Sequence, residues 1–408
     1  MPGLIESGSG KRDLSNFNLW PKSTRVRVAM MGGNTHHVPL ALGGDRVEGA
    51  DRGGCSSTGD AVPTLFDKGS NTTGHGPKSV TASYDLLPMS TPFERQRFFL
   101  TGGTGFLGEA VQLALRQRGV TDIVAPSSAD IDFRDRATTD TVIADSRPDI
   151  VIHLAARVGG IGANMAAPAD LYLENLLLGT NVIEAARLAD VAKIVVVGTI
   201  CSYPKHTPVP FQETSLWSGY PEETNAPYGI AKLAHLVHLQ ANRAQYGQQG
   251  AYLMPTNLYG PGDKFHPAVS HVIPALIRKC VLAREESADE IEVWGTGSAS
   301  REFLYVDDAA EGIVRAAEHW EGAEPVNLGA DRELLIKELV ELVAEATEFS
   351  GRIRWDHTKP DGQPRRSVDA SRARELFGFR ATTEFREGLR TTVEWYEANR
   401  DLAEARRS

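Results

Sequence analysis

Hydrophobic positions follow a regular pattern only from Arg97 onward in this chain of 408 residues. There, short apolar runs alternate with stretches whose apolar residues recur at helical spacing, such as Pro168–Ala189. The short runs predict strands at Arg97–Thr101, Ile123–Ala125, Ile150–Leu154 and Ile194–Val197. Near-continuous apolar strands that alternate with helices are typical of a parallel sheet covered on both faces. We therefore predict an α/β fold with a Rossmann-like, doubly wound parallel sheet.

The last third of the chain, from Pro274, has a mixed pattern. Short predicted strands, EIEVW at 290–294, REFLY at 301–305 and PVNLG at 325–329, alternate with helices such as Leu335–Thr347. We interpret this part as a smaller C-terminal α/β lobe. The predicted domains are an NAD(P)-binding domain mainly within 95–265 and a substrate-binding lobe mainly within 266–400.

Residues 1–88 are rich in Gly, Ser, Thr and Asp and show no sustained helical or strand periodicity. Such a segment buries too little apolar surface to offset its chain entropy, so we predict that it is disordered. Met89 opens a run that looks like a natural start, a few polar residues before the first strand. The segment is therefore a dispensable extension or an upstream mis-start, or alternatively a regulatory or targeting arm.

Composition and charge narrow the class of protein. The chain is 41% hydrophobic and 24% charged, as soluble globular proteins are, and its formal net charge of -10 argues against a nucleic-acid binder. The three cysteines, Cys55, Cys201 and Cys280, lie far apart and form neither a disulfide framework nor a metal-binding spacing. No apolar run reaches the roughly 18–20 residues of a membrane helix, and no signal peptide is visible. We expect a cytoplasmic protein without metal, membrane or nucleic-acid partners.

A glycine-rich loop, Gly102-Gly103-Thr104-Gly105-Phe106-Leu107-Gly108, follows the first predicted strand and opens a helix. Glycines at this spacing let backbone amides approach a pyrophosphate, which then lies on the N-terminus of the helix. The sequence predicts a dinucleotide site formed by Gly102, Gly105, Phe106, Leu107 and Gly108.

The end of the second strand bears on the choice of cofactor. An NAD site usually places a carboxylate there, whereas this chain has Ala125-Pro126-Ser127-Ser128. The absence of a carboxylate tolerates a 2′-phosphate, so NADP(H) is favoured and NAD(H) is not excluded. Asp132, a few residues further on, is either a residue at the adenine edge or part of a solvated turn.

Tyr228 and Lys232 form a YxxxK pair at the start of a predicted helix, with Pro227 in its first turn. A spacing of four places both side chains on one helix face. A nearby ammonium should lower the phenol pKa from about 10, so that Tyr228 exchanges a proton with a sugar oxygen while hydride moves at the adjacent carbon. Thr199, after the strand that ends at Gly198, supplies the hydroxyl that completes this triad, and Lys232 also faces the cofactor.

Longer motifs carry a more specific resemblance. From about Phe98 to about Asn399 the chain resembles the GDP-L-fucose synthases, bifunctional 3,5-epimerase/4-reductases of the extended short-chain dehydrogenase/reductase class. The matching runs are Ala156–Asn164, Cys201–Lys205, Pro255–Pro261, Ser270–Ala275, Trp294–Gly297, Arg301–Asp308 and Lys359–Gly362. Two positions depart from the family: Thr199 stands where serine is more frequent, and Thr104 stands where some members carry an arginine that favours NADP.

The resemblance implies a reaction on GDP-4-keto-6-deoxy-D-mannose, with inversion at C3 and C5 followed by reduction of C4 by NADPH. Cys201 matches the base and His271 the acid of the inversions; otherwise they are a small buried hydrophobe and a packed loop histidine. A thiol becomes a competent base once a nearby cation favours its thiolate. The implied substrate-binding residues, some of which could instead be ordinary surface charges, are Asn257, Lys279, Trp294, Arg301 and Arg366.

Two other functions remain open at this stage. One is a related GDP-sugar epimerase or C4 reductase that acts on another keto-deoxy sugar. The other is a non-catalytic nucleotide-sensing protein of the same fold, because a fold alone does not fix a function. The resemblance also implies a homodimer that forms through the helices of Asn164–Ala189 and Tyr228–Tyr246.

Overall fold

The computed structural model describes residues 91–159, 161–359 and 361–406. The chain divides into two units, Met1–Ser83 and Tyr84–Ser408, and all the described residues belong to the second. The predicted disorder of residues 1–88 lies outside the described residues. Within the described ranges, no helix is long and apolar enough to cross a membrane.

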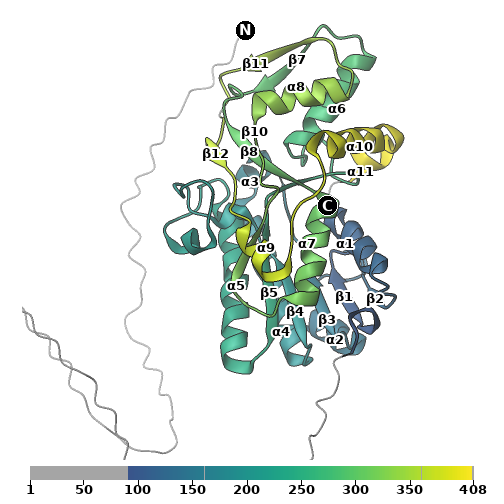
Figure 1. The fold of residues 1–408 in the computed structure, drawn as a ribbon, viewed down its shortest axis with the longest axis vertical. Coiled ribbons are helices and arrows are strands. Elements are labelled where there is room, and N and C mark those ends of the chain that lie inside the picture. Colours follow the sequence, from purple (N-terminus) through teal and green to yellow (C-terminus); the bar gives the residue numbers. More distant parts are fainter. Residues whose placement is uncertain (1–90, 160, 360, 407–408) are drawn as a thin grey trace, which may run out of the picture. The chain divides into compact units, whose positions relative to one another are not determined.

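A six-stranded parallel sheet forms the centre of the larger lobe (Figure 1). Each strand pairs in parallel with its neighbours, in the order β2-β1-β3-β4-β5-β9. The strands are β1 (Phe98–Thr101), β2 (Ile123–Val124), β3 (Ile150–His153), β4 (Lys193–Val197), β5 (Gln249–Pro255) and β9 (Pro325–Leu328).

Helices cover both faces of this sheet, because successive side chains of a strand point to opposite faces. On β1, Phe98 and Leu100 join the core beneath α1 and α7, whereas Phe99 joins the core beneath α4 and α5. The predicted doubly wound α/β fold is therefore confirmed. The helices of this lobe are α1 (Phe106–Gln117), α2 (Arg136–Ser146), α4 (Pro168–Leu188), α5 (Ala226–Tyr246) and α7 (Val306–His319).

The smaller lobe contains two further sheets. In one, β8 (Ser300–Tyr305) pairs with β6 (Asn257–Tyr259), β10 (Glu333–Leu335) and β12 (Arg365–Arg366); in the other, β7 (Glu290–Trp294) pairs with β11 (Arg352–Asp356). The helices α6 (Val272–Glu285), α8 (Ile336–Ala346) and α10 (Phe385–Ala398) pack with these sheets in a separate apolar core. The short elements are η1 (Phe93–Arg95), α3 (Ile161–Ala166), η2 (Ile200–Ser202), η3 (Glu213–Trp217), α9 (Ser371–Phe377) and α11 (Arg400–Ala405).

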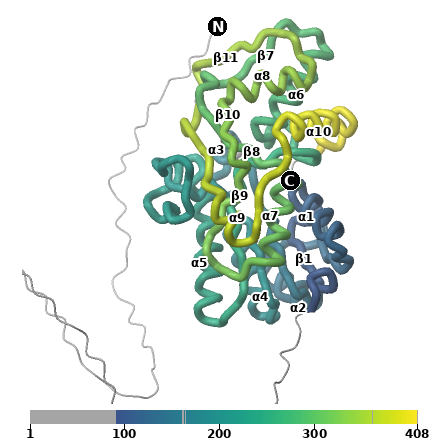
Figure 2. Tube along the Cα trace, viewed as in Figure 1, coloured from purple at the N-terminus to yellow at the C-terminus, as the bar shows by residue number. Residues whose placement is uncertain are grey.

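The strand β9 lies in the larger lobe, whereas we expected it in the smaller one. PVNLG at 325–329 was assigned to the smaller lobe, but β9 pairs with β5 at the edge of the six-stranded sheet. The preceding helix α7 returns from β8 to pack against α1, and in Figure 2 β9 and α9 lie with α7 in the larger lobe. A fully buried apolar run looks the same in either sheet, so the local pattern could not decide between them. The domain limits 95–265 and 266–400 stay a prediction.

β9 also anchors the loop that follows β4. The Tyr203 hydroxyl donates to Asn327 Oδ1 at 2.8 Å, and the Asn327 amide nitrogen donates to the Phe211 carbonyl at 3.0 Å. The backbone N–H of Asn327 donates to the Glu213 carboxylate at 2.9 Å. All of these groups are buried, where hydrogen-bond partners are costly to lose. The loop that begins at Thr199 is thus fixed to the central sheet.

Candidate active site

The glycine-rich loop lies where the ends of β1 and β3 meet. Gly102 has φ +70°, and a Cβ there would lie 2.8 Å from the backbone nitrogen of Ala155, just after β3. A Cβ on Gly108 would meet the Gly102 carbonyl, so helix α1 can pack against the loop only without that side chain. α1 begins at Phe106, followed by Leu107, and the first N–H groups of a helix have no partner within it. This edge, where the strand order reverses, is where α/β sheets bind their ligands.

The end of β2 lies directly against this loop, since a Cβ on Gly103 would approach the Ala125 side chain to 2.7 Å. Beyond it, the Ser127 hydroxyl donates to Asp130 at 2.5 Å. Asp132 accepts two hydrogen bonds of 2.8 Å from the Arg134 guanidinium, which lower the pKa of its half-exposed carboxyl. Asp132 is therefore a charged, paired group near the cofactor loop, and its contact with adenine stays a prediction.

The turn η2 places Thr199 and Cys201 beside Tyr228. Helix α5 begins at Ala226 with a proline in its first turn, as predicted. Gly229, in the same turn, has no side chain, and a Cβ there would lie only 2.6 Å from the Cys201 carbonyl oxygen. The Ser202 hydroxyl donates to the Gly229 carbonyl at 2.9 Å, and the Cys201 N–H donates to Thr199 Oγ1 at 3.2 Å. Sequence reasoning missed Gly229, although a glycine inside a YxxxK helix was a visible signal of close approach.

The pKa values of Tyr228 and Lys232 differ from our expectation. Burial raises the pKa of Tyr228, the negative charge of Cys201 raises it further, and a hydrogen bond with Thr199 acts in the opposite direction. Lys232 is buried and donates to the Val197 carbonyl at 3.0 Å, and burial lowers the pKa of its ammonium to about 8. The expected lowering of the Tyr228 pKa by Lys232 is wrong for the chain alone, because burial is the largest effect on this pKa and it raises the pKa.

Two buried histidines lie behind Lys232, and sequence reasoning missed both. His153 Nδ1 and the Thr101 hydroxyl are joined by a hydrogen bond of 2.8 Å, and the rings of His153 and His235 lie 6.0 Å apart. Burial, followed by the charge of Lys232, lowers the pKa of both, that of His235 to about 3. Both imidazoles are therefore neutral, and they add no further charge around the ammonium.

Arg366, in the smaller lobe, contacts Cys201. Its Nη1 donates to Cys201 Sγ at 3.6 Å, and β12 pairs in register with β8 so that Arg366 lies opposite Arg301. Burial, and then the charge of Arg366, lowers the pKa of Arg301 to about 10. The structure thus brings Cys201, Arg301 and Arg366 together.

His271 is the N-cap residue of α6. Its side chain reaches the surface, but the surrounding protein atoms reduce its hydration, and this effect together with the Lys264 ammonium lowers its pKa. No hydrogen bond joins His271 to Cys201 in the part of the chain that the structure describes.

The remaining predicted residues, Asn257, Lys279 and Trp294, occupy two places in the smaller lobe. Asn257 donates to the Glu302 carbonyl at 2.8 Å, which holds β6 to β8. Lys279 donates to the Glu292 carbonyl at 2.6 Å, two residues before Trp294. The indole of Trp294 is 63% exposed, and the Lys359 ammonium lies 5.2 Å from its ring centre. Lys279 and Trp294 therefore share one edge of the lobe, while the Asn257 amide already has a structural partner.

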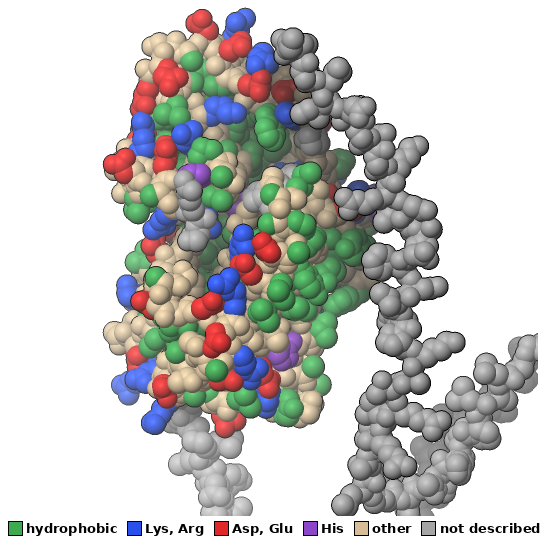
Figure 3. Space-filling model, turned by 180° about the vertical axis from the view of Figure 1, so that it is seen from behind, with side chains coloured by type: hydrophobic (Ala, Val, Ile, Leu, Met, Phe, Trp, Pro, Cys, Tyr) green, Lys and Arg blue, Asp and Glu red, His purple; other side chains and the backbone are tan. Residues whose placement is uncertain are grey.

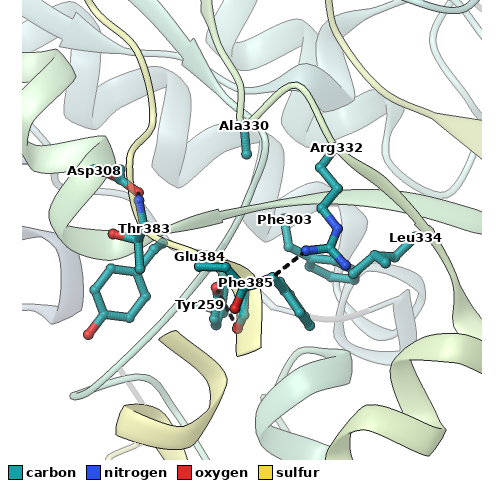
Figure 4. Close-up of a pocket in the computed structure, with 10 residues that line it drawn as sticks. Tyr259, Phe303, Asp308, Ala330, Arg332, Leu334, Thr383, Glu384 and Phe385 are labelled. Carbon is teal, nitrogen blue, oxygen red and sulfur yellow. Dashed lines mark hydrogen bonds and ion pairs between the residues drawn. The ribbon is translucent and has the colours of Figure 1, made fainter. Parts of the chain in front are cut away.

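A separate hollow of about 170 Å³ lies between β6, β8 and the start of α10 (Figure 4). Aromatic rings line it, and the Arg332–Glu384 ion pair of 3.1 Å lies at its side. Asp308 uses its carboxylate to hold the backbone N–H groups of Thr382 and Thr383. None of the predicted site residues lines this hollow, so it is distinct from the candidate active site. Across the described ranges, no group of three or more His, Cys, Asp or Glu side chains could hold a metal ion.

Comparison with known proteins defines the class. Residues 98–329 match the model of the NAD dependent epimerase/dehydratase family, and the chain belongs to that family. GDP-L-fucose synthase 1 of Arabidopsis thaliana is 43% identical over 303 residues, which are 74% of this chain and 94% of that protein. GDP-L-fucose synthase of Escherichia coli (strain K12) is 38% identical over 316 residues, which are 75% of this chain and 98% of that protein. The resemblance predicted from the motifs is confirmed.

Solved structures agree with this placement. A GDP-L-fucose synthetase from Naegleria fowleri bound to NADP has a TM-score of 0.71 at 28% identity, covering 76% of this chain and 95% of that one. A GDP-6-OMe-4-keto-L-xylo-heptose reductase from C. jejuni has a TM-score of 0.72 at 25% identity, covering 76% and 99%.

Proposed function

We propose that this protein converts GDP-4-keto-6-deoxy-D-mannose to GDP-L-fucose with NADPH, by inversion at C3 and C5 and then reduction at C4. The observation that carries the proposal is the contact of η2 with α5 at Gly229, which places Cys201 and Thr199 beside Tyr228. This proximity supports two different proton transfers at one wall of the site, one by Cys201 and one by Tyr228. The names of the plant and bacterial relatives support the same reaction.

The cofactor would lie along the glycine-rich loop, and when bound it supplies the hydride. Gly102, Gly105 and Gly108 let the backbone approach a pyrophosphate, and Phe106 and Leu107 contribute the first N–H groups of α1. Asp132 would lie towards the adenine and Lys232 towards the nicotinamide ribose. The NADP bound to the similar synthetase supports NADP(H) as the cofactor.

In the inversions, the Cys201 thiolate removes the proton at C3 or C5, next to the keto group, and leaves an enolate with its charge on O4. His271 returns a proton to the opposite face of the sugar ring. A protonated imidazole is needed for this step, and the lowered pKa of His271 makes it a strong acid once it is charged.

In the reduction, Tyr228 donates its phenolic proton to O4 as hydride reaches C4, and the Thr199 hydroxyl holds the same oxygen. The raised pKa of Tyr228 fits the role of a donor, because the phenol stays protonated at neutral pH. Lys232 restores the proton afterwards, since its pKa of about 8 allows it to give one up.

Arg301, Lys279 and Trp294 would hold the nucleotide part of the substrate, with Asn257 ordering the loop and Arg366 as a further cation. We also propose a homodimer through α4 and α5. Exposed apolar side chains on these helices support it: Tyr172, Leu173, Leu188 and Val237. Figure 3 shows apolar side chains gathered on the reverse face of the described part of the chain. Cys201 and Cys280 are free thiols, which supports a reducing, cytoplasmic location.

The test is turnover with product identification. The protein is incubated with NADPH and GDP-4-keto-6-deoxy-D-mannose, and the product is identified by NMR. GDP-L-fucose is the expected product. A product reduced at C4 without inversion at C3 and C5 would instead indicate the alternative C4 reductase, as in the heptose reductase of similar fold. Bound cofactor without any turnover would contradict both.

A further inference from the structure

Arg366 contacts the sulfur of Cys201, although the resemblance had suggested the nucleotide as its partner. Nη1 of the half-buried guanidinium lies 3.6 Å from Cys201 Sγ, within the range of a hydrogen bond to sulfur. A guanidinium always carries its charge and only donates hydrogen bonds. The acceptor that suits it best is therefore an ionised sulfur.

The guanidinium is held in this orientation from behind. Its Nε and Nη2 both donate to Gln363 Oε1, at 3.2 and 3.0 Å. The same amide donates through Nε2 to the Lys205 carbonyl at 2.9 Å, in the loop that carries Cys201. Gln363 thus couples Arg366 to that loop and leaves Nη1 directed at the thiol.

No carboxylate neutralises Arg366 within the ranges that the structure describes. Its neighbour Arg365 differs, because it is exposed and forms an ion pair with Glu333. In these ranges the Arg366 guanidinium donates hydrogen bonds to a neutral amide, that of Gln363, and to the Cys201 sulfur. A negative charge on the sulfur would therefore balance the charge of Arg366.

The groups that face Cys201 come from three elements besides its own. Arg366 lies on β12, Arg301 on β8 and Tyr228 on α5, and Thr199 lies in the same turn as the cysteine. Two of these groups are fixed cations. Tyr228 is the one acid among them, and the charge of Cys201 raises the pKa of its phenol, so an anionic sulfur keeps Tyr228 in its donor form.

The geometry points to Arg366 as a positioning residue that, held by Gln363, orients the Cys201 sulfur and stabilises negative charge on it when it acts as the base of the inversions. The proton of the thiol passes to solvent, and the thiolate then accepts the carbon-bound proton in each inversion and releases it again. This inference rests on the proposed function for its purpose, but the ionisation of Cys201 can be measured without any sugar.

The test is the rate at which iodoacetamide alkylates Cys201 in the full-length protein, followed by peptide mass spectrometry so that Cys55 and Cys280 are read separately. We expect Arg366→Gln to slow alkylation about tenfold at neutral pH, the effect of losing one charged hydrogen bond, and to move the pH profile upwards. At high pH the two rates should converge, because both sulfurs are then ionised. Arg366→Lys should restore most of the neutral-pH rate.

Arg365→Gln is the matched control, since it removes the neighbouring cation from the same strand, and its profile should match that of the unmodified protein. Identical profiles for Arg366→Gln and the unmodified protein would overturn the inference. So would an equal loss of rate at every pH, because that result indicates altered access rather than altered ionisation. If the profile shifts but GDP-4-keto-6-deoxy-D-mannose is not turned over, the proposed function fails and this inference stands.

Discussion

The contact between η2 and α5 can be tested by placing a methyl group in it. In Gly229→Ala, the new Cβ would lie 2.6 Å from the Cys201 carbonyl oxygen, 3.1 Å from its carbonyl carbon and 3.2 Å from Ser202 Cα. All three neighbours are backbone atoms, so no side chain can rotate away. Ordinary contact begins near 3.4 Å, and the turn must therefore retreat from α5 by about 0.8 Å.

Two energies oppose each other in this variant. Alanine favours a helix interior over glycine by about 0.5–1 kcal/mol, whereas overpacking of this kind costs about 1–3 kcal/mol. We expect a net loss of about 1–2 kcal/mol in the free energy of unfolding. The catalytic loss should be larger in proportion, because a displacement near 1 Å at a reacting group can cost about 100-fold in rate.

The assay measures unfolding by denaturant, hydrogen exchange at C3 and C5, and NADPH oxidation. Both rates should fall about 100-fold, since Cys201 and Thr199 move together, while NADPH affinity should not change. Gly162→Ala is the control, because a Cβ there meets no atom within 4 Å. Normal rates of both steps in Gly229→Ala would refute the account of how the two groups are held together.

Three further predictions follow from the geometry. Burial lowers the pKa of Lys232 from 10.5 to about 8, so protonation of this side chain destabilises the folded protein as pH falls from 10.5 towards 8. Relative to Lys232→Met, the free energy of unfolding should therefore rise by about 3 kcal/mol as pH rises from 8 to 10.5, measured by urea unfolding. Cys201→Ser should stop hydrogen exchange at C3 and C5 with cofactor binding intact, whereas Tyr228→Phe should stop NADPH oxidation while exchange continues; the reverse pattern would exchange their roles. Thr104→Arg should raise the kcat/KM preference for NADPH over NADH several-fold, because Ser127 and Thr104 offer hydroxyls but no cation; an unchanged ratio would place the 2′-phosphate elsewhere.

Four of the six strands of the larger lobe were predicted because their signal is local, whereas β5 was not predicted. The run predicted at Arg97–Thr101 is β1 at Phe98–Thr101, and Ile194–Val197 is β4 at Lys193–Val197. The assignment of PVNLG failed because its partner, β5, ends 70 residues earlier in the chain. A buried strand carries no mark of the sheet that it joins, so only the path of α7 decides it.

The candidate site was predictable where its chemistry lies within one helix or one turn. Tyr228 and Lys232 share a helix, and Thr199 and Cys201 share a turn. The sequence could not indicate that Gln363 would bond to the Lys205 carbonyl, 158 residues away, or that Arg366 would reach Cys201. The pKa of Tyr228 was also out of reach, because it depends on burial rather than on the spacing to Lys232.

The central claim is that one site carries two separate proton transfers, one at Cys201 and one at Tyr228. The most direct measurement is turnover of GDP-4-keto-6-deoxy-D-mannose with NADPH in deuterated water, with the product examined by NMR. The account predicts GDP-L-fucose that carries solvent deuterium at both C3 and C5 and the cofactor's hydrogen at C4. A C4-reduced sugar that keeps its original hydrogens at C3 and C5 would contradict it.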